Sequence, residues 1–282
     1  MSRCTCRAVR PLPPQVSHFG GFLLQTSVTP SSSCIARIKS VGPDATSLKG
    51  GQLVFVDFWN QSRDNTDDSI LQGYMGGNTT LEKAWSSVPL EHTWTLNEEL
   101  LTSKLGYSYV DLAYLGTGGS AVLAALALGA HATACGRNRD TLDKTADTFR
   151  ASGRFSTVQC TGDVDKDAAS ILAVCTNPKG ADALIDFSPP QSAGSKHLVS
   201  CFSALRPHGK ATLMGAVFSN VEVPYWLVMR NNIKIQGRYM FDRWHGEQAI
   251  KLIESGYLKL GSGENSGIRV HSFGLEGCRA GT

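Results

Sequence analysis

The fold of this chain is decided by a glycine-rich turn between two apolar stretches, Gly116-Thr117-Gly118-Gly119-Ser120-Ala121. The turn fits the pattern G-x-G-x-x-A, with an apolar stretch at 110–115 before it and an Ala/Leu-rich stretch at 120–128 after it. In a strand-to-helix turn of this kind, the glycines let the backbone approach a pyrophosphate, and the small last residue lets helix and strand pack closely. Backbone N–H groups at the start of the helix then bind phosphate. Such turns also arise for steric reasons alone, so the neighbouring sequence has to decide.

Downstream of this turn, apolar strand candidates alternate with helical patterns, which is typical of a parallel sheet covered on both faces. The predicted strands are residues 110–115, 131–135, 155–160, 183–187, 210–214 and 233–236. The predicted helices are residues 120–128, 140–150, 166–175 and 192–205. Crossovers of this length predict a doubly wound α/β fold. In that context the glycine turn favours nucleotide binding.

The residues after the second predicted strand indicate which dinucleotide would bind. An NAD-specific fold usually carries an acid here, which bonds the ribose 2′-hydroxyl. This chain has Arg137 and Asn138 instead. A guanidinium pairs with a 2′-phosphate, whereas a carboxylate repels it, so the sequence favours NADP(H) over NAD(H). The alternative is that Arg137 is a solvated loop residue, like its neighbour Arg139.

The remaining candidate binding residues follow later strands, because ligands of open α/β sheets collect at the carboxyl ends of the strands. We expect the cofactor to contact these residues and the glycine turn, together with Arg137 and Asn138. Besides Arg137 and Asn138, the predicted cofactor-binding residues are Gly116, Thr117, Gly118, Gly119, Ser120, Asp163, Val164, Ser188, Pro189 and Gly215. Each of the later residues, taken alone, is equally explained as turn chemistry.

The N-terminal part of the chain is predicted to form a smaller β-rich unit. It is strand-like from Cys34 and contains the apolar run 53–58, while a helix is predicted at 97–104 and a last helix, 246–255, would return the chain to this unit. Residues 1–43 lack Asp and Glu, a bias shared with transit peptides. Three prolines break any targeting helix there, so residues 1–33 are expected to be disordered.

Composition excludes several classes of function. The 282 residues carry 27 basic and 24 acidic side chains, a net charge of +3, so no nucleic-acid partner is expected. The longest apolar run, 121–132, is shorter than the roughly 18 residues that a membrane span requires. Apart from Cys4 and Cys6, the cysteines are scattered. They predict buried residues in a reducing, cytoplasmic environment rather than disulfides or a zinc ribbon.

Taken in order, these stretches resemble the medium-chain dehydrogenase/reductases, the zinc-type alcohol dehydrogenase-like proteins, and in particular their fungal quinone-reductase-like members. The resemblance covers residues 34–275 and is carried by 41–49, 51–56, 126–138, 180–190, 205–210, 214–215 and 233–237. It implies a reduced GroES-like domain at 34–109, a Rossmann NADP-binding domain at 110–245, and a C-terminal helix and tail at 246–282. It also implies hydride transfer between NAD(P)(H) and alcohols, carbonyls or activated double bonds. Family members often pair through an edge strand, for which residues 217–226 are available, so a homodimer is expected.

The chain departs from this family at the zinc site and at the entry to the Rossmann domain. Where zinc-dependent members carry Gly-His-Glu, it reads Ser31-Ser32-Ser33, and no cysteine cluster resembles the structural zinc lobe. A tetrahedral site needs three or four ligands held together, so no metal is expected. The family's first Rossmann strand has no counterpart. The resemblance therefore implies helix at 111–114, whereas the residue pattern predicts a strand at 110–115, and both interpretations stay open.

The sequence thus predicts a zinc-independent, NADP(H)-dependent oxidoreductase of a small-molecule substrate, which works by holding donor and acceptor in position. Tyr74, in a glycine-rich loop, is a weak candidate acid, although packing explains it more simply. Two alternatives stay open. One is a catalytically inactive nucleotide-binding remnant of a dehydrogenase, and the other is a truncated, non-functional product.

Overall fold

The computed structural model describes residues 18–19, 22–23, 33–43, 45–57, 59–61, 69–71, 93–105 and 119–260. The chain divides into two compact units, one formed by Met1–Leu115 with Asp242–Thr282 and the other by Gly116–Phe241. The glycine turn up to Gly118, including Gly116 and Thr117, lies outside the described residues, as do Tyr74 and the predicted strand at 110–115.

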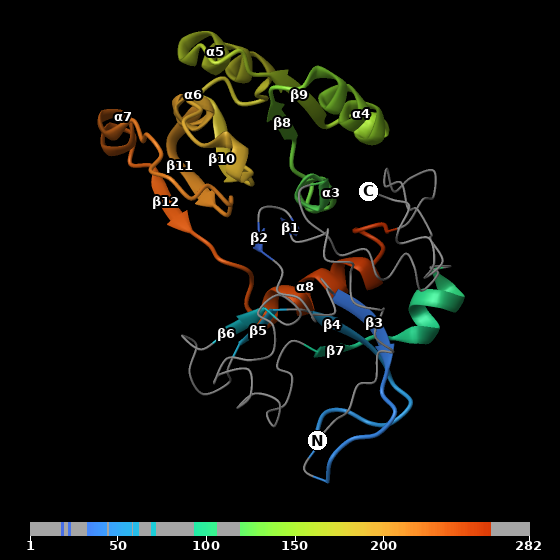
Figure 1. The fold of residues 1–282 in the computed structure, drawn as a ribbon. Helices are drawn as coiled ribbons and strands as arrows, with labels where there is room; N and C mark the ends of the chain where they lie inside the picture. The colour runs from blue at the N-terminus through green and yellow to red at the C-terminus, as the bar shows by residue number, and fades with distance from the viewer. Residues whose placement is uncertain are drawn as a thin grey trace. The chain divides into compact units, whose positions relative to one another are not determined.

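The first unit is built on an antiparallel sheet of order β3-β4-β7 (Figure 1). Its central strand is buried at all five positions, because Val54 and Val56 pack with Ile38 while Phe55 stacks on Trp94 with ring centroids 5.8 Å apart. The pair β1–β2 lies in the segment for which the sequence predicts disorder. The strands are β1 (His18–Phe19), β2 (Phe22–Leu23), β3 (Ser33–Arg37), β4 (Leu53–Asp57), β5 (Trp59–Gln61), β6 (Ser69–Leu71) and β7 (Thr93–Thr95).

The described residues of the first unit also form two helices. Helix α8 (Arg243–Glu254) packs against β7, where a Cβ on Gly246 would lie 2.5 Å from the indole of Trp94. The close approach therefore requires glycine at this position. The Arg243 guanidinium lies 5.7 Å from the Trp94 ring centroid. The helix predicted at 97–104 is observed as the π-helix η1 (Glu99–Lys104), where the Leu105 N–H donates to the Leu100 carbonyl at 3.0 Å.

The second unit confirms the predicted α/β class, with parallel strands and helices between them. The strands are β8 (Ala132–Gly136), β9 (Phe155–Gln159), β10 (Ala181–Asp186), β11 (Leu205–Leu213) and β12 (Lys234–Gly237). The helices are α3 (Gly119–Ala127), α4 (Arg139–Phe149), α5 (Val164–Val174), α6 (His197–Ser203) and α7 (Tyr225–Arg230), with short 3-10 turns η2 (Arg150–Ser152) and η3 (Pro190–Ser192).

The described strands of this unit form a two-stranded sheet, β8-β9, and a three-stranded sheet, β10-β11-β12. The strand at 110–115, which would complete the predicted sheet of six, lies outside the described residues and stays a prediction. One feature of this unit corrects the sequence analysis. Residues 217–226 supply no edge strand, because Pro224 precedes a helix that begins at Tyr225. Among the described strands, β12 lies at one edge of the larger sheet instead.

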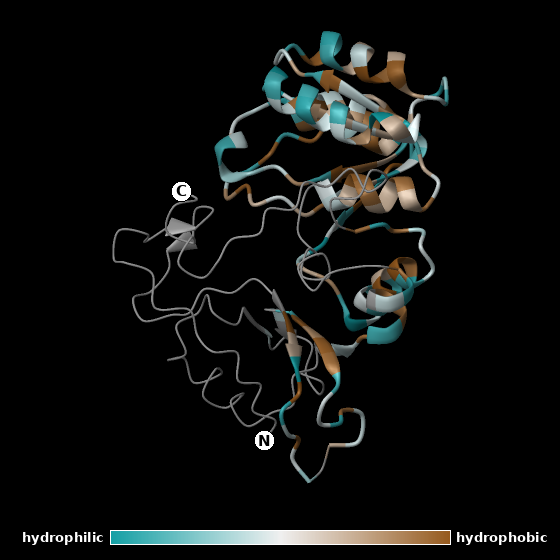
Figure 2. Ribbon diagram, turned by 90° about the vertical axis from the view of Figure 1, so that its right-hand side faces the viewer, coloured by the Kyte–Doolittle hydropathy of each residue, from teal (hydrophilic) through white to brown (hydrophobic). Residues whose placement is uncertain are grey.

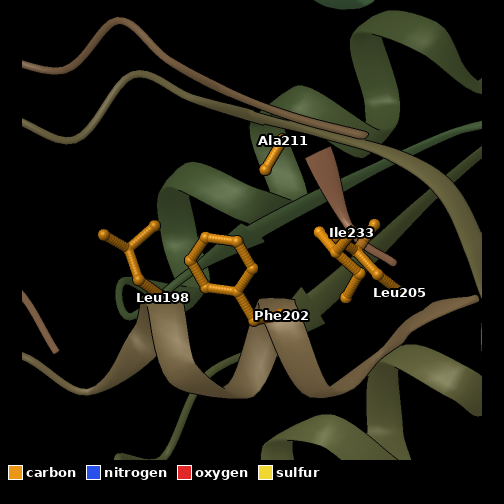
Figure 3. Close-up of a cluster of buried hydrophobic side chains, with 5 residues drawn as sticks. All are labelled: Leu198, Phe202, Leu205, Ala211 and Ile233. Carbon is orange, nitrogen blue, oxygen red and sulfur yellow. The ribbon is translucent and has the colours of Figure 1, made fainter. Parts of the chain in front are cut away.

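The core of the second unit lies between α6 and the three-stranded sheet (Figure 3). Leu198 and Phe202, four residues apart on one face of α6, pack with Leu205, Ala211 and Ile233. A second cluster joins Val158 of β9 and Ile171 of α5 to Ala204, at the end of α6. Figure 2 shows hydrophobic and hydrophilic residues interspersed along the helices of this unit, as expected for helices with one face on a sheet.

Candidate active site at the carboxyl ends of β10 and β11

A polar site lies at the point where β10 and β11 end. Asp186, the last residue of β10, is buried, and its Oδ1 accepts the backbone N–H of Ser188 at 3.0 Å as well as a hydrogen bond from the Ser188 hydroxyl. The backbones stay paired beyond the strands, because the Ala216 N–H donates to the Ser188 carbonyl at 2.8 Å. A Cβ on Gly215 would lie 2.7 Å from Asp186 Oδ2. Because Gly215 has no side chain, the two strand ends can approach closely enough to form the site.

His197 completes this site from the first turn of α6. Its Nε2 lies 2.6 Å from Ser188 Oγ and 3.9 Å from Asp186 Oδ1. Its Nδ1 lies 2.9 Å from Ser195 Oγ. Both ring nitrogens are thus engaged, and the imidazole is held in one orientation.

The electrostatics of the site favour an ionised Asp186. Burial alone would raise the pKa of this carboxyl group, but the neighbouring His197 imidazole and the hydrogen bonds from Ser188 outweigh that effect and hold the pKa below its usual value. An ionised carboxylate, a hydroxyl and an imidazole therefore form one connected network. Such a network can hold or transfer a proton.

Arg137 and Asn138, the residues expected to select the cofactor, differ from each other in their hydrogen bonds. Asn138 caps α4, where its side chain accepts the Thr141 N–H at 2.9 Å. The Arg137 carbonyl accepts a hydrogen bond from Gln159 Nε2 at 3.2 Å, while its exposed guanidinium has no partner among the described residues. Arg139, by contrast, pairs with Asp143 at 3.0 Å. Arg137 is therefore available to bind an anion.

The predicted phosphate-binding helix, α3, begins at Gly119, followed by Ser120. No atom of the described residues lies within 4 Å of a Cβ added to Gly119. Backbone N–H groups in the first turn of a helix have no partner within that helix. The described residues therefore fit a bound diphosphate at this position.

Asp163 and Val164 form the entry to α5. Asp163 caps the helix by accepting the Lys166 N–H at 3.1 Å, and Val164 is the first helical residue. Pro189 precedes η3, and its carbonyl accepts the Ser192 N–H at 2.9 Å. The structure thus gives each of these predicted contact residues a local role in turn or cap formation. Of the predicted residues, it brings Ser188 and Gly215 together.

The cysteines of the second unit are free thiols. A hydrogen bond with Cys160 lowers the pKa of the Cys135 thiol, but a hydrogen bond to Cys201 and burial outweigh it and raise that pKa to about 12. The thiolate is the form that attacks or binds metal, and the raised pKa disfavours that form at Cys135. No group of three or more His, Cys, Asp or Glu side chains in the described ranges could hold a metal ion. No helix in those ranges is long and apolar enough to cross a membrane.

Solved structures share this architecture. The chain is similar to the alcohol dehydrogenase TADH from Thermus sp. ATN1 (TM-score 0.60, 13% identity, 88% of this chain and 80% of that chain). It is similar to the alcohol dehydrogenase of Aeropyrum pernix (TM-score 0.57, 15% identity, 82% and 74%). It also resembles the 2R,3R-butanediol dehydrogenase from Bacillus subtilis (TM-score 0.54, 14% identity, 83% and 72%). No protein-family model matches the chain, and no curated protein sequence is detectably similar to it.

These likenesses establish the fold. The chain has the alcohol dehydrogenase fold, in which a β-rich GroES-like unit precedes a Rossmann unit with parallel strands. The site described above therefore lies at the strand ends where open α/β sheets bind their ligands. Sequence reasoning placed Ser188 and Gly215 at this edge but missed Asp186, Ser195 and His197. Asp186 could have been found as an acid at the end of a predicted strand, whereas nothing in the sequence marks His197.

Proposed function

We propose that this protein is a nicotinamide-dependent oxidoreductase of the medium-chain dehydrogenase/reductase type, which prefers NADP(H) and transfers hydride without zinc to or from an alcohol, carbonyl, enone or quinone. The observation that carries the proposal is a polar site at the strand ends of an alcohol dehydrogenase fold. The free thiols of the second unit are consistent with a cytoplasmic location. The proposed substrate is a small molecule rather than a polymer.

The nicotinamide cofactor supplies the hydride when it is bound. Of the residues present, the first turn of α3 would hold its diphosphate, and the Arg137 guanidinium would hold a 2′-phosphate. Asp186, Ser188 and His197 would offer hydrogen bonds to the reacting group. Positioning of this kind supplies much of the catalysis in hydride transfer.

The proposal is tested by titrating the purified protein with NADPH and assaying turnover on a panel of aldehydes, enones and quinones after treatment with a chelator. Saturable binding with chelator-resistant turnover supports it. Saturable binding without turnover favours an inactive nucleotide-binding remnant. Absent binding together with low thermal stability favours a non-functional product.

Arg137→Ala should weaken the binding of NADPH by about 1 to 3 kcal/mol, because a charged hydrogen bond to the 2′-phosphate is lost. The binding of NADH, which lacks that phosphate, should change little. Arg139→Ala is the matched control, since its side chain already pairs with Asp143. Dissociation constants for both cofactors measure the effect. An equal loss for NADPH and NADH, or an equal effect of the two substitutions, would remove the case for NADP(H).

We further propose that the protein forms a homodimer through the β12 edge and the neighbouring segment 217–226. All four residues of β12 are exposed, and so are the aromatic side chains of Phe218, Tyr225 and Trp226, at 73%, 78% and 66%. Among the described strands none pairs with the outer edge of β12, and monomers rarely expose such an edge beside large apolar side chains. Sedimentation velocity should show a dimer, and Trp226→Glu should shift it to monomer. A wild-type protein that sediments as a monomer would contradict this proposal.

A further inference from the structure

The helix that would hold the cofactor's diphosphate, α3, is fastened at its far end by the side chain of Arg154. We propose that Arg154 is a positioning residue for the dinucleotide, which fixes the direction of α3 relative to β8 and so sets where the first turn of α3 meets the diphosphate. This inference rests on the nicotinamide-cofactor function proposed above. It goes beyond that function, because Arg154 lies at the end of the helix opposite to the diphosphate.

The Arg154 guanidinium binds two backbone carbonyl groups, one in the last turn of α3 and one in the turn that follows. Its Nη2 donates to the Leu126 carbonyl at 2.9 Å, and its Nη1 donates to the Ala130 carbonyl at 2.9 Å. Carbonyl groups in the last turn of a helix have no partner within that helix, and a positive charge beside them is favourable. Two charge-assisted hydrogen bonds from one planar group therefore fix the end of α3 in both position and direction.

The turn between α3 and β8 closes through its own backbone, and Arg154 spans it. Gly129 has a φ of +88°, its N–H donates to the Leu126 carbonyl at 3.1 Å, and the Ala130 N–H donates to the Ala125 carbonyl at 2.9 Å. This is the common glycine cap at the end of a helix. Because the guanidinium bonds to a carbonyl on each side of Gly129, it joins the end of α3 to the segment that enters β8.

The backbone of Arg154 is itself held at the start of the β8–β9 pair. Its carbonyl accepts the Ala132 N–H at 2.9 Å, and β8 and β9 then stay paired over five consecutive residues. The end of β8, from which Arg137 follows, is therefore fixed by strand pairing and does not depend on the Arg154 side chain. Arg154 thus attaches α3 to a strand pair whose geometry is already set.

This attachment matters because the packing of α3 is slight. Of the nine residues in the helix, only Leu126 is buried. At a rise of about 1.5 Å per residue the helix is about 13 Å long, so a tilt of about 5° at its end would move Gly119 by about 1 Å. A misplacement of about 1 Å is enough to weaken the interactions of a positioned group strongly.

The proposed cofactor needs two points of attachment at a fixed spacing. The first turn of α3 would hold the diphosphate, and Arg137 would hold the 2′-phosphate of NADP(H). A ligand that binds at two linked points gains affinity only when the geometry lets both engage at once. Loss of the Arg154 side chain should therefore weaken ligands that carry the diphosphate and spare one that carries the 2′-phosphate alone.

The experiment uses the full-length protein with Arg154→Ala and Arg154→Lys. Arg150→Ala is the matched control, because Arg150 lies nearby in the chain but pairs with Asp147 on the surface. Dissociation constants are measured by calorimetry for NADPH, NADH and adenosine 2′-monophosphate, which lacks the diphosphate. Amide hydrogen exchange of α3 and of β8, measured without ligand, reports the attachment of the helix directly.

Arg154→Ala should raise the dissociation constants of NADPH and NADH by the same factor, about 5- to 150-fold, the usual range for coupling between two sites. The dissociation constant of adenosine 2′-monophosphate should stay unchanged. Arg154→Lys should show a smaller increase, because an ammonium group keeps the charge but lacks the planar fork that reaches two carbonyl groups. Amide exchange should become faster in α3 and stay unchanged in β8. Arg137→Ala should give the opposite binding pattern, weakening NADPH and adenosine 2′-monophosphate but not NADH.

Four results would overturn the inference. Unchanged dissociation constants of both dinucleotides in Arg154→Ala remove the positioning role and leave the oxidoreductase function standing. An equal loss for all three ligands shows that Arg154 only stabilises the unit as a whole. If Arg154→Ala does not fold, wild-type dissociation constants in Arg154→Lys count against the two-carbonyl attachment. A wild-type protein that binds neither dinucleotide removes both this inference and the proposed function.

Discussion

Gly180→Ala should lower the free energy of unfolding of the second unit by about 2 to 6 kcal/mol. Gly180 has a φ of +113°, which L side chains rarely adopt, and an added Cβ would lie 2.4 Å from the Ala204 carbonyl oxygen. Backbone strain costs about 1 to 3 kcal/mol and overpacking a similar amount. Since domains are stable by about 5 to 15 kcal/mol, the loss is a large fraction of the stability of the unit.

The Gly180→Ala effect is large because its neighbours are all backbone atoms. The nearest are the Ala204 carbonyl oxygen, the Arg206 nitrogen and the Leu205 carbonyl carbon, where α6 passes into β11. The Ala181 N–H also donates to the Ala204 carbonyl at 2.9 Å. A side chain at position 180 would therefore force apart the junction that starts the three-stranded sheet.

Two control variants separate strain from overlap. Gly194→Ala has only the strain, with a φ of +75° and no atom within 4 Å of the added Cβ. Gly237→Ala has neither strain nor a neighbour within that distance. In urea unfolding, Gly180→Ala should lose more unfolding free energy than Gly194→Ala. Gly194→Ala should in turn lose more than Gly237→Ala. Equal stability of the variants at 180 and 194 would show that the overlap is relieved by local movement.

Asp167→Asn should cost about 1 to 3 kcal/mol of unfolding free energy at neutral pH, because one backbone N–H of the loop loses its acceptor. Asp167 is buried in α5 and binds the loop after β9 with both oxygens. Oδ1 accepts the Thr161 N–H and hydroxyl, each at 2.8 Å, and Oδ2 accepts the Gly162 N–H at 2.9 Å. Asparagine has one oxygen, so its amide nitrogen would face an N–H group. Asp165→Asn, an exposed residue of the same helix, is the matched control.

The effect of Asp167 should also depend on pH. Burial alone would raise the pKa of Asp167, but hydrogen bonds from Thr161 and Gly162 outweigh this and lower it below its usual value. A lowered pKa in the folded state adds stability above the unfolded-state pKa of about 3.9, and this stability is lost as pH falls through the folded-state pKa. The difference in unfolding free energy between the wild type and Asp167→Asn should therefore become smaller below about pH 4. A difference in unfolding free energy that stays constant from pH 7 to well below pH 4 would contradict the role of Asp167 ionisation.

Much of the second unit was predictable because its strands and helices have strong local patterns. The predicted strands 131–135 and 155–160 agree with β8 and β9 to within one residue at each end, and the helix 140–150 agrees with α4. The junction between α6 and β11 was predicted less well. The helix was expected over 192–205 but begins at His197, because Gly194 adopts a positive φ, and β11 begins at Leu205 instead of residue 210.

The sequence by itself determined the alternation of strands and helices, the absence of an acid after β8, and the placement of Ser188 and Gly215 at strand ends, because each depends on residues close in the chain. Only the tertiary structure decided that His197 reaches Ser188, since a turn through Gly194 and Ser195 directs the start of α6 back over the end of β10. The same holds for Gly215, whose lack of a side chain matters only because another strand brings Asp186 beside it. Hydrogen bonds across such turns act only at short range, and sequence spacing does not specify which groups come within that range.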